Sequence, residues 1–273
     1  MSTSARRWLL HALLSVAAVL TLFPLLWMVS ASFMASGEAS TLPPPLLPSH
    51  GTLSNYRQLF GAQNIGRYVV NSLWLAVLTT LLSLLFNSAA GYAFAKLRFR
   101  GREPLLRALL AALVIPSQVA MLPLFLMMKW LGLVNTYAGV VVPAMAGIFG
   151  VFLVRQYALA IPDELLEAAR IDGAGELRIF ASIVLPALKP ILVTLAVLTF
   201  LGSWNDFLWP LIVLTDQSLY TLPIALATLS REHVQDNELM MAGAVLTVLP
   251  VLLLFLALQR YYIRGILVGS VKG

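Results

Sequence analysis

Six long stretches without a formal charge constrain the fold of this chain more than any other feature. They cover residues 8–37, 68–95, 108–128, 130–154, 190–215 and 239–259, and only Asp206 interrupts the fifth. A helix needs about 20 mainly apolar residues to cross the hydrocarbon core of a bilayer. None of the stretches alternates in polarity as the strands of a membrane barrel do. The pattern predicts an all-α membrane protein with six transmembrane helices.

The composition excludes several other classes of protein. Of the 273 residues, 60% are apolar and 11% are charged, whereas about 25% are charged in an ordinary soluble domain. A soluble fold of this length cannot hide so much apolar surface, which excludes a soluble enzyme, a disordered tail and a collagen-like fibre. Because the chain has no cysteine and three scattered histidines, we expect no disulfide and no metal site.

We expect a single transmembrane domain over residues 1–273. The predicted helices cover residues 9–33, 68–94, 107–129, 138–156, 189–213 and 240–261. The first helix could instead be a secretory signal, but its apolar stretch exceeds a signal's usual core of about 7–15 residues. An uncleaved anchor helix is therefore favoured.

The basic residues predict the orientation in the membrane, because cytoplasmic loops carry an excess of Lys and Arg. With the N-terminus inside and six alternating helices, 14 of the 18 basic residues lie inside. Only Arg57, Arg67, Lys129 and Arg231 then lie outside. Both termini should therefore be cytoplasmic. The net charge of +6 reflects this topology and gives no support to nucleic-acid binding.

The segments between the helices differ in character. The proline-rich stretch 42–48 should be an extended outside segment. For residues 55–60 a plain connector is favoured over a short interfacial helix. A tight outside turn is expected at 135–139, a longer outside loop at 216–238, and a short basic inside turn at 96–107. Pro116, Pro123 and Pro143 could kink the third and fourth helices.

The longest inside segment, residues 155–189, is too polar to span but strongly patterned. Pro162 and the following acidic residues suit a helix start, and Gly173 suits a helix stop. We therefore expect an amphipathic helix at 162–172 and a second short helix at 176–184. The first helix could lie on the lipid surface, but its acidic polar side favours a protein partner.

This segment also carries a spaced motif. Glu167-Ala168-Ala169 is followed by Gly173, and nine residues later by Ile183-x-Leu185-Pro186. Every spacing resembles the EAA loop of permease subunits of binding-protein-dependent ABC importers, EAA-x3-G-x9-I-x-LP, and we place this loop at residues 161–187. The segments 204–210 and 259–273 resemble the carbohydrate group of these permeases, in particular the smaller permease subunit of the maltose transporter.

The resemblance implies a set of partners and roles. The chain would be a non-enzymatic transport subunit of the prokaryotic cytoplasmic (inner) membrane, for a di- or oligosaccharide. It would work with a second homologous permease, two ATPase subunits and an extracytoplasmic solute-binding protein. Because no GxxxxGK[ST] loop occurs, the chain would bind no cofactor and its partners would hydrolyse ATP. The implied ATPase-coupling residues are Glu167, Ala168, Ala169, Asp172, Gly173, Ile183, Leu185 and Pro186. The implied ATPase-contacting tail is Gly269, Ser270, Val271, Lys272 and Gly273, for which a frayed end is the alternative.

The path through the membrane is less sharply marked. Polar groups inside spans are costly and often functional. Candidates are Asn87, Gln118, Ser203, Trp204, Asn205 and Asp206. For Asp206 a structural role is favoured over contact with a sugar hydroxyl. Thr79, Ser83, Asn87 and Gly91 recur at steps of four on one helix face, and helix packing is favoured over pathway lining there.

Two other functions compete with this one. A stand-alone secondary transporter predicts coupling acids within the spans, where only Asp206 qualifies. An intramembrane enzyme needs a nucleophile–base pair or a metal set, and no span combines His with Asp or Glu. Among importers, one for glycerol phosphate or another small polar solute remains the alternative to a sugar importer.

Overall fold

The computed structural model of the chain is helical. It describes the backbone of residues 3–232 and 236–270 and the side chains of residues 6–230 and 236–257. No strand occurs in these backbone ranges, so the prediction of an all-α protein is confirmed.

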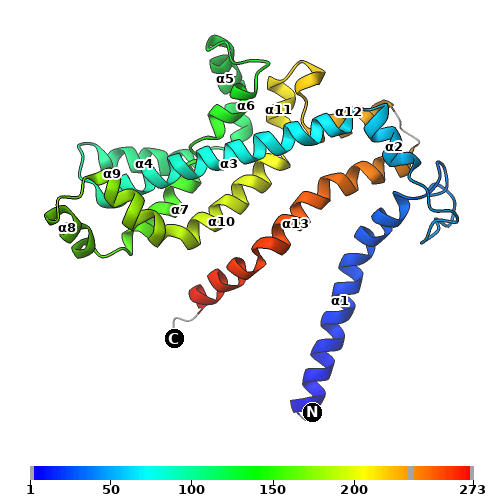
Figure 1. Ribbon diagram of the computed structural model, residues 1–273, viewed down its shortest axis with the longest axis horizontal. Helices are drawn as coiled ribbons and strands as arrows, with labels where there is room; N and C mark the ends of the chain where they lie inside the picture. Colours follow the sequence, from blue (N-terminus) through cyan, green and yellow to red (C-terminus); the bar gives the residue numbers. More distant parts are fainter. Residues whose placement is uncertain (1–2, 233–235, 271–273) are drawn as a thin grey trace. The chain divides into compact units, whose positions relative to one another are not determined.

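Figure 1 shows the helices and their labels, which are numbered in the order of the chain. They are α1 (Thr3–Ala31), α2 (Ser54–Gly61), α3 (Ile65–Lys96), α4 (Arg102–Ala112), α5 (Ser117–Trp130), α6 (Tyr137–Ala144), α7 (Ile148–Leu159), α8 (Asp163–Ile171), α9 (Glu176–Ile179), the π-helical turn η1 (Phe180–Val184), α10 (Leu185–Trp204), α11 (Leu208–Val213), the 3₁₀ turn η2 (Gln217–Leu219), α12 (Leu222–Glu232) and α13 (Asn237–Ser270).

Within the described residues, five helical segments are long and apolar enough to cross a bilayer. They are Arg6–Ala31, Ile65–Lys96, Tyr137–Leu159, Glu176–Trp204 and Asn237–Ala257. A sixth span would need α4 and α5 together, and these two helices are bent by 111° at the break between them. The prediction of one continuous helix over 107–129 is therefore wrong.

Pro116 explains this break. It precedes α5 with an extended ψ of 133°, it has no N–H to donate, and its ring disfavours helical backbone at the residue before it. The expected kink at this proline is therefore present, and it is strong enough to separate two helices.

The fifth predicted helix, 189–213, is also interrupted. Helix α10 ends at Trp204 and α11 begins at Leu208, so Asp206 lies in the break and not inside a helix. Its Oδ1 accepts the N–H of Trp209, in the first turn of α11, at 3.4 Å, and so satisfies an N–H that the start of a helix leaves without a partner. The carboxylate thus helps begin a new helix where an unbroken one was expected.

Two short helices were not expected. Residues 54–61 form α2, where a connector was favoured, and the amide of Asn55 donates to the carbonyls of Ser32 and Met34 at 3.0 and 2.9 Å. The predicted 216–238 loop contains α12, whose Leu222, Ile224 and Leu229 are buried. Both helices are shorter than a membrane span, so they lack the long apolar run by which a spanning helix is recognised in a sequence.

The chain divides into two compact units. Unit 1 comprises Met1–Val69 and Leu222–Leu252, and unit 2 comprises Val70–Thr221 and Leu253–Gly273. Within unit 1 the proline-rich stretch is neither helix nor strand, as expected. It is held to α1 by bonds from Trp27 to the carbonyl of Pro45 and from Ser30 to that of Leu46, of 3.0 and 2.6 Å.

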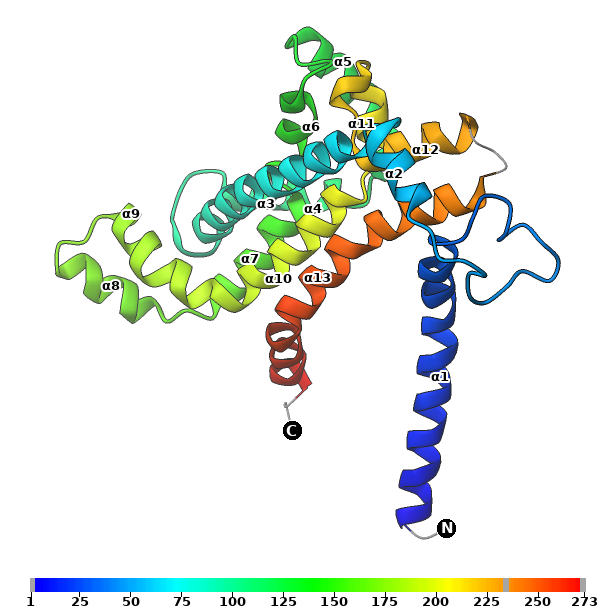
Figure 2. The same ribbon diagram turned by 45° about the vertical axis from the view of Figure 1, so that its right-hand side comes forward.

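Unit 2 contains α4–α11 and most of α3. Helix α3 packs closely on α7, since a Cβ at Gly91 would lie 2.6 Å from Val154 Cγ1. One core cluster joins α3, α7, α8, α9 and α10, and it includes Tyr92, Val154, Ala158, Leu166, Ile179 and Leu188. Figure 2 shows the result: α8 and α9 lie near the C-terminal end of α3, and α11 lies towards the other end of the unit.

Candidate functional site

Helix α8 is a short helix whose ends are both defined by local chemistry. Pro162 precedes it, and Asp163 and Glu164 occupy its first turn, where negative charge stabilises the positive end of the helix dipole. Arg170 lies in its last turn, where a positive charge is favourable. The helix predicted at 162–172 is therefore present over residues 163–171.

Gly173 ends α8 in the way expected. Its φ is +81°, in the left-handed region that favours glycine. Its N–H donates to the carbonyl of Arg170 at 3.0 Å, and the N–H of Ala174 donates to that of Ala169 at 2.9 Å. These two bonds satisfy carbonyls that the end of a helix leaves without a partner.

The two faces of α8 differ. Leu166 is 1% exposed and packs into the core cluster of unit 2. Glu167, Ala168 and Asp172 are exposed. Ile171, at the end of α8, is 86% exposed, and Leu177 of the following helix α9 is 85% exposed. The helix therefore presents acidic, small and apolar groups outward on a rigid base.

The remaining residues of the motif support this base. Ala169 and Ile183 are half-buried against the same core cluster. Leu185 is half-buried and Pro186 is exposed at the start of α10.

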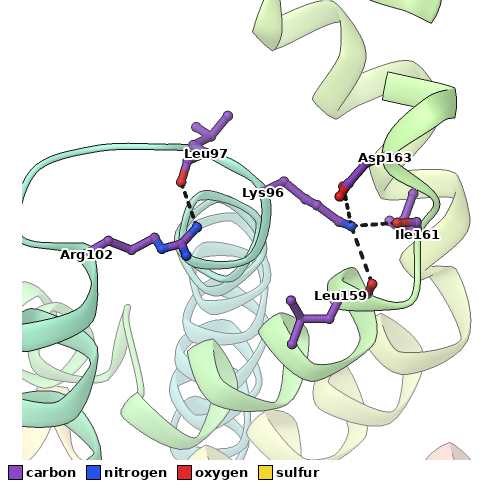
Figure 3. A network of polar contacts seen from close by, with 6 residues as sticks. All are labelled: Lys96, Leu97, Arg102, Leu159, Ile161 and Asp163. Atoms are coloured by element: carbon purple, nitrogen blue, oxygen red, sulfur yellow. Dashed lines mark hydrogen bonds and ion pairs between the residues drawn. The ribbon is translucent and has the colours of Figure 1, made fainter. Parts of the chain in front are cut away.

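Helix α3 holds the start of α8 through Lys96. Its ammonium donates to the carbonyls of Leu159 and Ile161 at 3.4 and 2.6 Å and pairs with Asp163 Oδ1 at 2.7 Å (Figure 3). The Lys96 side chain is 6% exposed and that of Asp163 71%. The hydrogen bond, and then the charge of the ammonium, lowers the pKa of the Asp163 carboxyl below its ordinary value.

A second polar chain reaches the other end of α8. The Tyr92 hydroxyl donates to Glu176 Oε2 at 2.8 Å, and Arg170 Nε pairs with Glu176 Oε1 at 2.7 Å. The ring of Tyr92 lies 5.7 Å from that of Phe180. Sequence reasoning singled out neither Tyr92 nor Lys96 as a site residue, because no local spacing connects them to a helix about 70 positions later.

A cavity of about 400 Å³ lies elsewhere in unit 2, between α3, α5, α6, α10 and residues 206–209. Its lining includes Thr79, Ser117, Thr199, Ser203, Asp206 and Trp209, together with apolar side chains. The Trp209 indole is oriented by a bond to the Gly139 carbonyl of 3.1 Å. The cavity thus combines one carboxylate, several hydroxyls and an aromatic ring.

Of the predicted pathway residues, Ser203 and Asp206 line this cavity and four do not. Asn87 is 1% exposed, and a Cβ at Gly150 would lie 2.5 Å from its amide nitrogen. Trp204 is buried and stacks on Phe200 at 6.1 Å. Asn205 donates to the Leu201 carbonyl at 2.9 Å, and Gln118 is exposed.

The face of α3 with small and polar residues therefore serves mainly for packing. Gly91 and Asn87 contact α7, whereas Thr79 lines the cavity. Thr199 and Ser117 also line the cavity, and no sequence pattern distinguished them.

The predicted tail falls at the limit of the structure. Gly269 and Ser270 form the end of α13. Val271, Lys272 and Gly273 lie outside the described residues.

Comparison with known proteins identifies the family. Residues 87–268 match the family described as binding-protein-dependent transport system inner membrane component. The chain is 44% identical to the arabinooligosaccharides transport system permease protein AraQ of Halalkalibacterium halodurans, over 97% of this chain and 96% of that protein. It is 34% identical to the lactose transport system permease protein LacG of Rhizobium radiobacter, over 96% and 95% of the two chains.

A solved structure has the same fold. A chain of a bacterial ABC transporter involved in the import of the acidic polysaccharide alginate superposes with a TM-score of 0.85 at 24% identity, over 96% of this chain and 99% of that one. Together with the apolar spanning helices, these matches show that this chain is a multi-pass membrane protein of the family of binding-protein-dependent transport system inner membrane components, the permeases of ABC importers.

Proposed function

We propose that the chain forms half of the translocation pathway of an ABC importer for a di- or oligosaccharide and that α8 couples it to a separate ATPase. The observation that carries this proposal is α8 itself: a capped helix, anchored by Leu166, with exposed Glu167, Ala168 and Ile171. We infer that units 1 and 2 act together as one permease domain over residues 1–273.

The outward surface of α8 and α9 suits a protein partner. Burying a side chain the size of Ile171 or Leu177 stabilises by about 1.5–3 kcal/mol. Because both side chains are exposed, a partner that covers them would gain this free energy on binding. Ala168 permits close approach of a partner backbone, and Glu167 offers a carboxylate to a basic side chain. We propose the same role for Ala169, Asp172 and the Ile183-x-Leu185-Pro186 stretch, which shape or support this surface.

The energy source lies outside this chain in our proposal. The sequence has no GxxxxGK[ST] loop to bind the phosphates of ATP. Two ATPase subunits would hydrolyse ATP, and a second homologous permease and an extracytoplasmic solute-binding protein would complete the assembly. The residues at 269–273 would contact the ATPase subunits.

The distribution of basic residues supports an orientation with both termini and α8 in the cytoplasm of a prokaryote. This orientation places α8 on the side of the membrane where ATP is available.

The cavity supports a neutral sugar as substrate. Sugar hydroxyls can bond to Asp206 and to the hydroxyls of Thr79, Thr199 and Ser203, and the Trp209 ring offers an apolar face. Among the described side chains, those that line this cavity include no Lys or Arg, which disfavours glycerol phosphate. Relatives named for arabinooligosaccharides and lactose agree with this class.

Purification of the tagged chain from its native membrane in mild detergent, followed by mass spectrometry, tests this function. We expect an ATPase and a second permease to be recovered with it. Glu167→Lys should reduce recovery of the ATPase and leave membrane insertion intact. Glu103→Lys is the matched control, because it reverses an exposed acidic residue in the first turn of α4. Recovery of the chain alone in several detergents would favour a stand-alone transporter.

The cavity has its own test in cells that import the sugar. Asp206→Ala should reduce uptake about tenfold, because a bond to a charged group contributes about 1.5–3 kcal/mol. Asn205→Ala, next to it but outside the cavity lining, should leave uptake within about twofold. Equal effects of the two variants would remove this cavity from the pathway.

A further inference from the structure

The C-terminal end of α3 is linked by side chains to both ends of α8, although the chain connects α8 only to α7 and α9. Lys96 holds its start, and Tyr92 holds its last turn through Glu176 and Arg170. Tyr92 and Lys96 are four residues apart and therefore lie on the same face of α3. We propose that these two side chains are positioning residues that link α8 to α3, Lys96 through Asp163 and Tyr92 through Glu176 of α9, so that movement of α8 moves the cavity wall.

The geometry of Lys96 makes it a fixed link. An ammonium has three N–H donors, and Lys96 has three acceptors: Leu159 O, Ile161 O and Asp163 Oδ1. With its side chain 6% exposed, water has little access to replace them. Removing the ammonium would take this partner from the carbonyl of Ile161, a buried residue, which is costly for a polar group with little access to water.

The link at the other end is built from two bonds in series. Glu176 shares its two carboxylate oxygens between the Tyr92 hydroxyl and the Arg170 guanidinium. Tyr92 is 3% exposed and belongs to the same core cluster as Leu166 of α8. A rotation or translation of α8 must therefore move the end of α3 or break these contacts.

Helix α3 can carry this movement to the cavity. It is continuous from Lys96 back to Thr79, with no proline between them. Seventeen residues at 1.5 Å each span about 26 Å, and Thr79 lines the cavity that contains Asp206. The path rests on the proposed function, since it needs an ATPase that displaces α8.

The test uses the assembled transporter in proteoliposomes, with its solute-binding protein, and measures ATP hydrolysed per sugar imported. Lys96→Met and Tyr92→Phe remove the two polar links and keep most of the side-chain volume. Arg102→Met is the matched control, because Arg102 also donates to a carbonyl, that of Leu97, and its bonds to Leu97 and Glu103 stay within its own segment of the chain (Figure 3). Lys96→Arg tests rescue by a donor of the same charge.

We expect the double variant to hydrolyse about tenfold more ATP per sugar than the unaltered transporter, a change within the usual range for coupling between sites. Arg102→Met and Lys96→Arg should stay within about twofold. The ratio does not depend on how much complex is recovered, so a loss of assembled protein does not obscure it. A normal ratio in the double variant, whether both rates are normal or both fall together, overturns the proposal.

The same preparation separates this proposal from the broader one. If the unaltered chain is recovered without an ATPase, the proposed function itself fails. If the complete transporter assembles and couples, and the double variant couples equally well, only the link through α3 fails.

Discussion

Gly173 and Gly175 provide a sharp test of how α8 ends. Both glycines are exposed, and a Cβ added at either would meet no atom within 4 Å. They differ in backbone conformation: φ is +81° at Gly173 and −72° at Gly175. Any difference between Gly173→Ala and Gly175→Ala must therefore come from the backbone and not from a steric clash.

The magnitude follows from that difference. A residue with a Cβ pays about 1–2 kcal/mol in the left-handed region, so Gly173→Ala should destabilise the last turn of α8 by that amount. At Gly175 alanine adopts the native conformation without strain and should stabilise by about 0.4–1 kcal/mol through the unfolded chain. Since 1.4 kcal/mol is about tenfold in an equilibrium constant, opening of the last turn should increase about 5- to 30-fold in Gly173→Ala.

Hydrogen exchange on the purified protein measures this opening directly. Amides of residues 168–174 should exchange faster in Gly173→Ala and unchanged or slower in Gly175→Ala. Gly173→Asn should lie between the unaltered protein and Gly173→Ala, because Asn tolerates the left-handed region. The same exchange rates in both alanine variants would refute the assignment of Gly173 as the residue that ends α8.

Three further predictions concern unit 2. Leu166→Ala should destabilise the unit by about 2–5 kcal/mol. Leu165→Ala, at a side chain that is 49% exposed, should destabilise it by less than about 1 kcal/mol. Chemical unfolding in detergent compares the two variants, and equal effects would contradict the burial of one face of α8. Gly150→Ala should destabilise by about 1–3 kcal/mol through its contact with the Asn87 amide, and Asn87→Ser should relieve part of this loss in the double variant, whereas additive losses would contradict the contact. The pKa of Asp163 is lower in the folded protein than in the unfolded chain, so the stability that its charge contributes is present above the unfolded pKa and is lost as pH falls through the folded pKa. Hydrogen exchange of residues 160–166, corrected for intrinsic rates, should show this loss. In Asp163→Asn the exchange rates should no longer depend on pH in this way.

Local chemistry made α8 predictable from the sequence. Pro162, the acidic first turn and Gly173 act on the backbone within a few residues. As a result, the first and last residues of α8 each lie within one residue of the predicted bounds. The spanning helices are equally predictable from the apolar runs. A spanning helix forms all its backbone hydrogen bonds within itself, so it needs only sufficient length and apolar side chains.

The breaks within the predicted spans were harder to place. The third run continues without a charge through Pro116, and the fifth run is apolar on both sides of Asp206, so composition alone indicates continuous helices. Whether a proline bends a helix or separates two depends on what its neighbours pack against, and the structure shows a turn of 111° at the first site. Asp206 is the only charge in its run, but nothing in the sequence around it marks its place between two helices.

The sequence by itself determined that the chain is a helical membrane protein and where α8 begins and ends, because these features depend on composition and on contacts within a few residues. Only the tertiary structure decided which side chains meet across distant segments: Lys96 with Asp163, Tyr92 with Glu176, and Thr79 with Asp206 around one cavity. The physical reason is that such contacts depend on how helices pack, and packing brings together positions whose separation along the chain carries no signal.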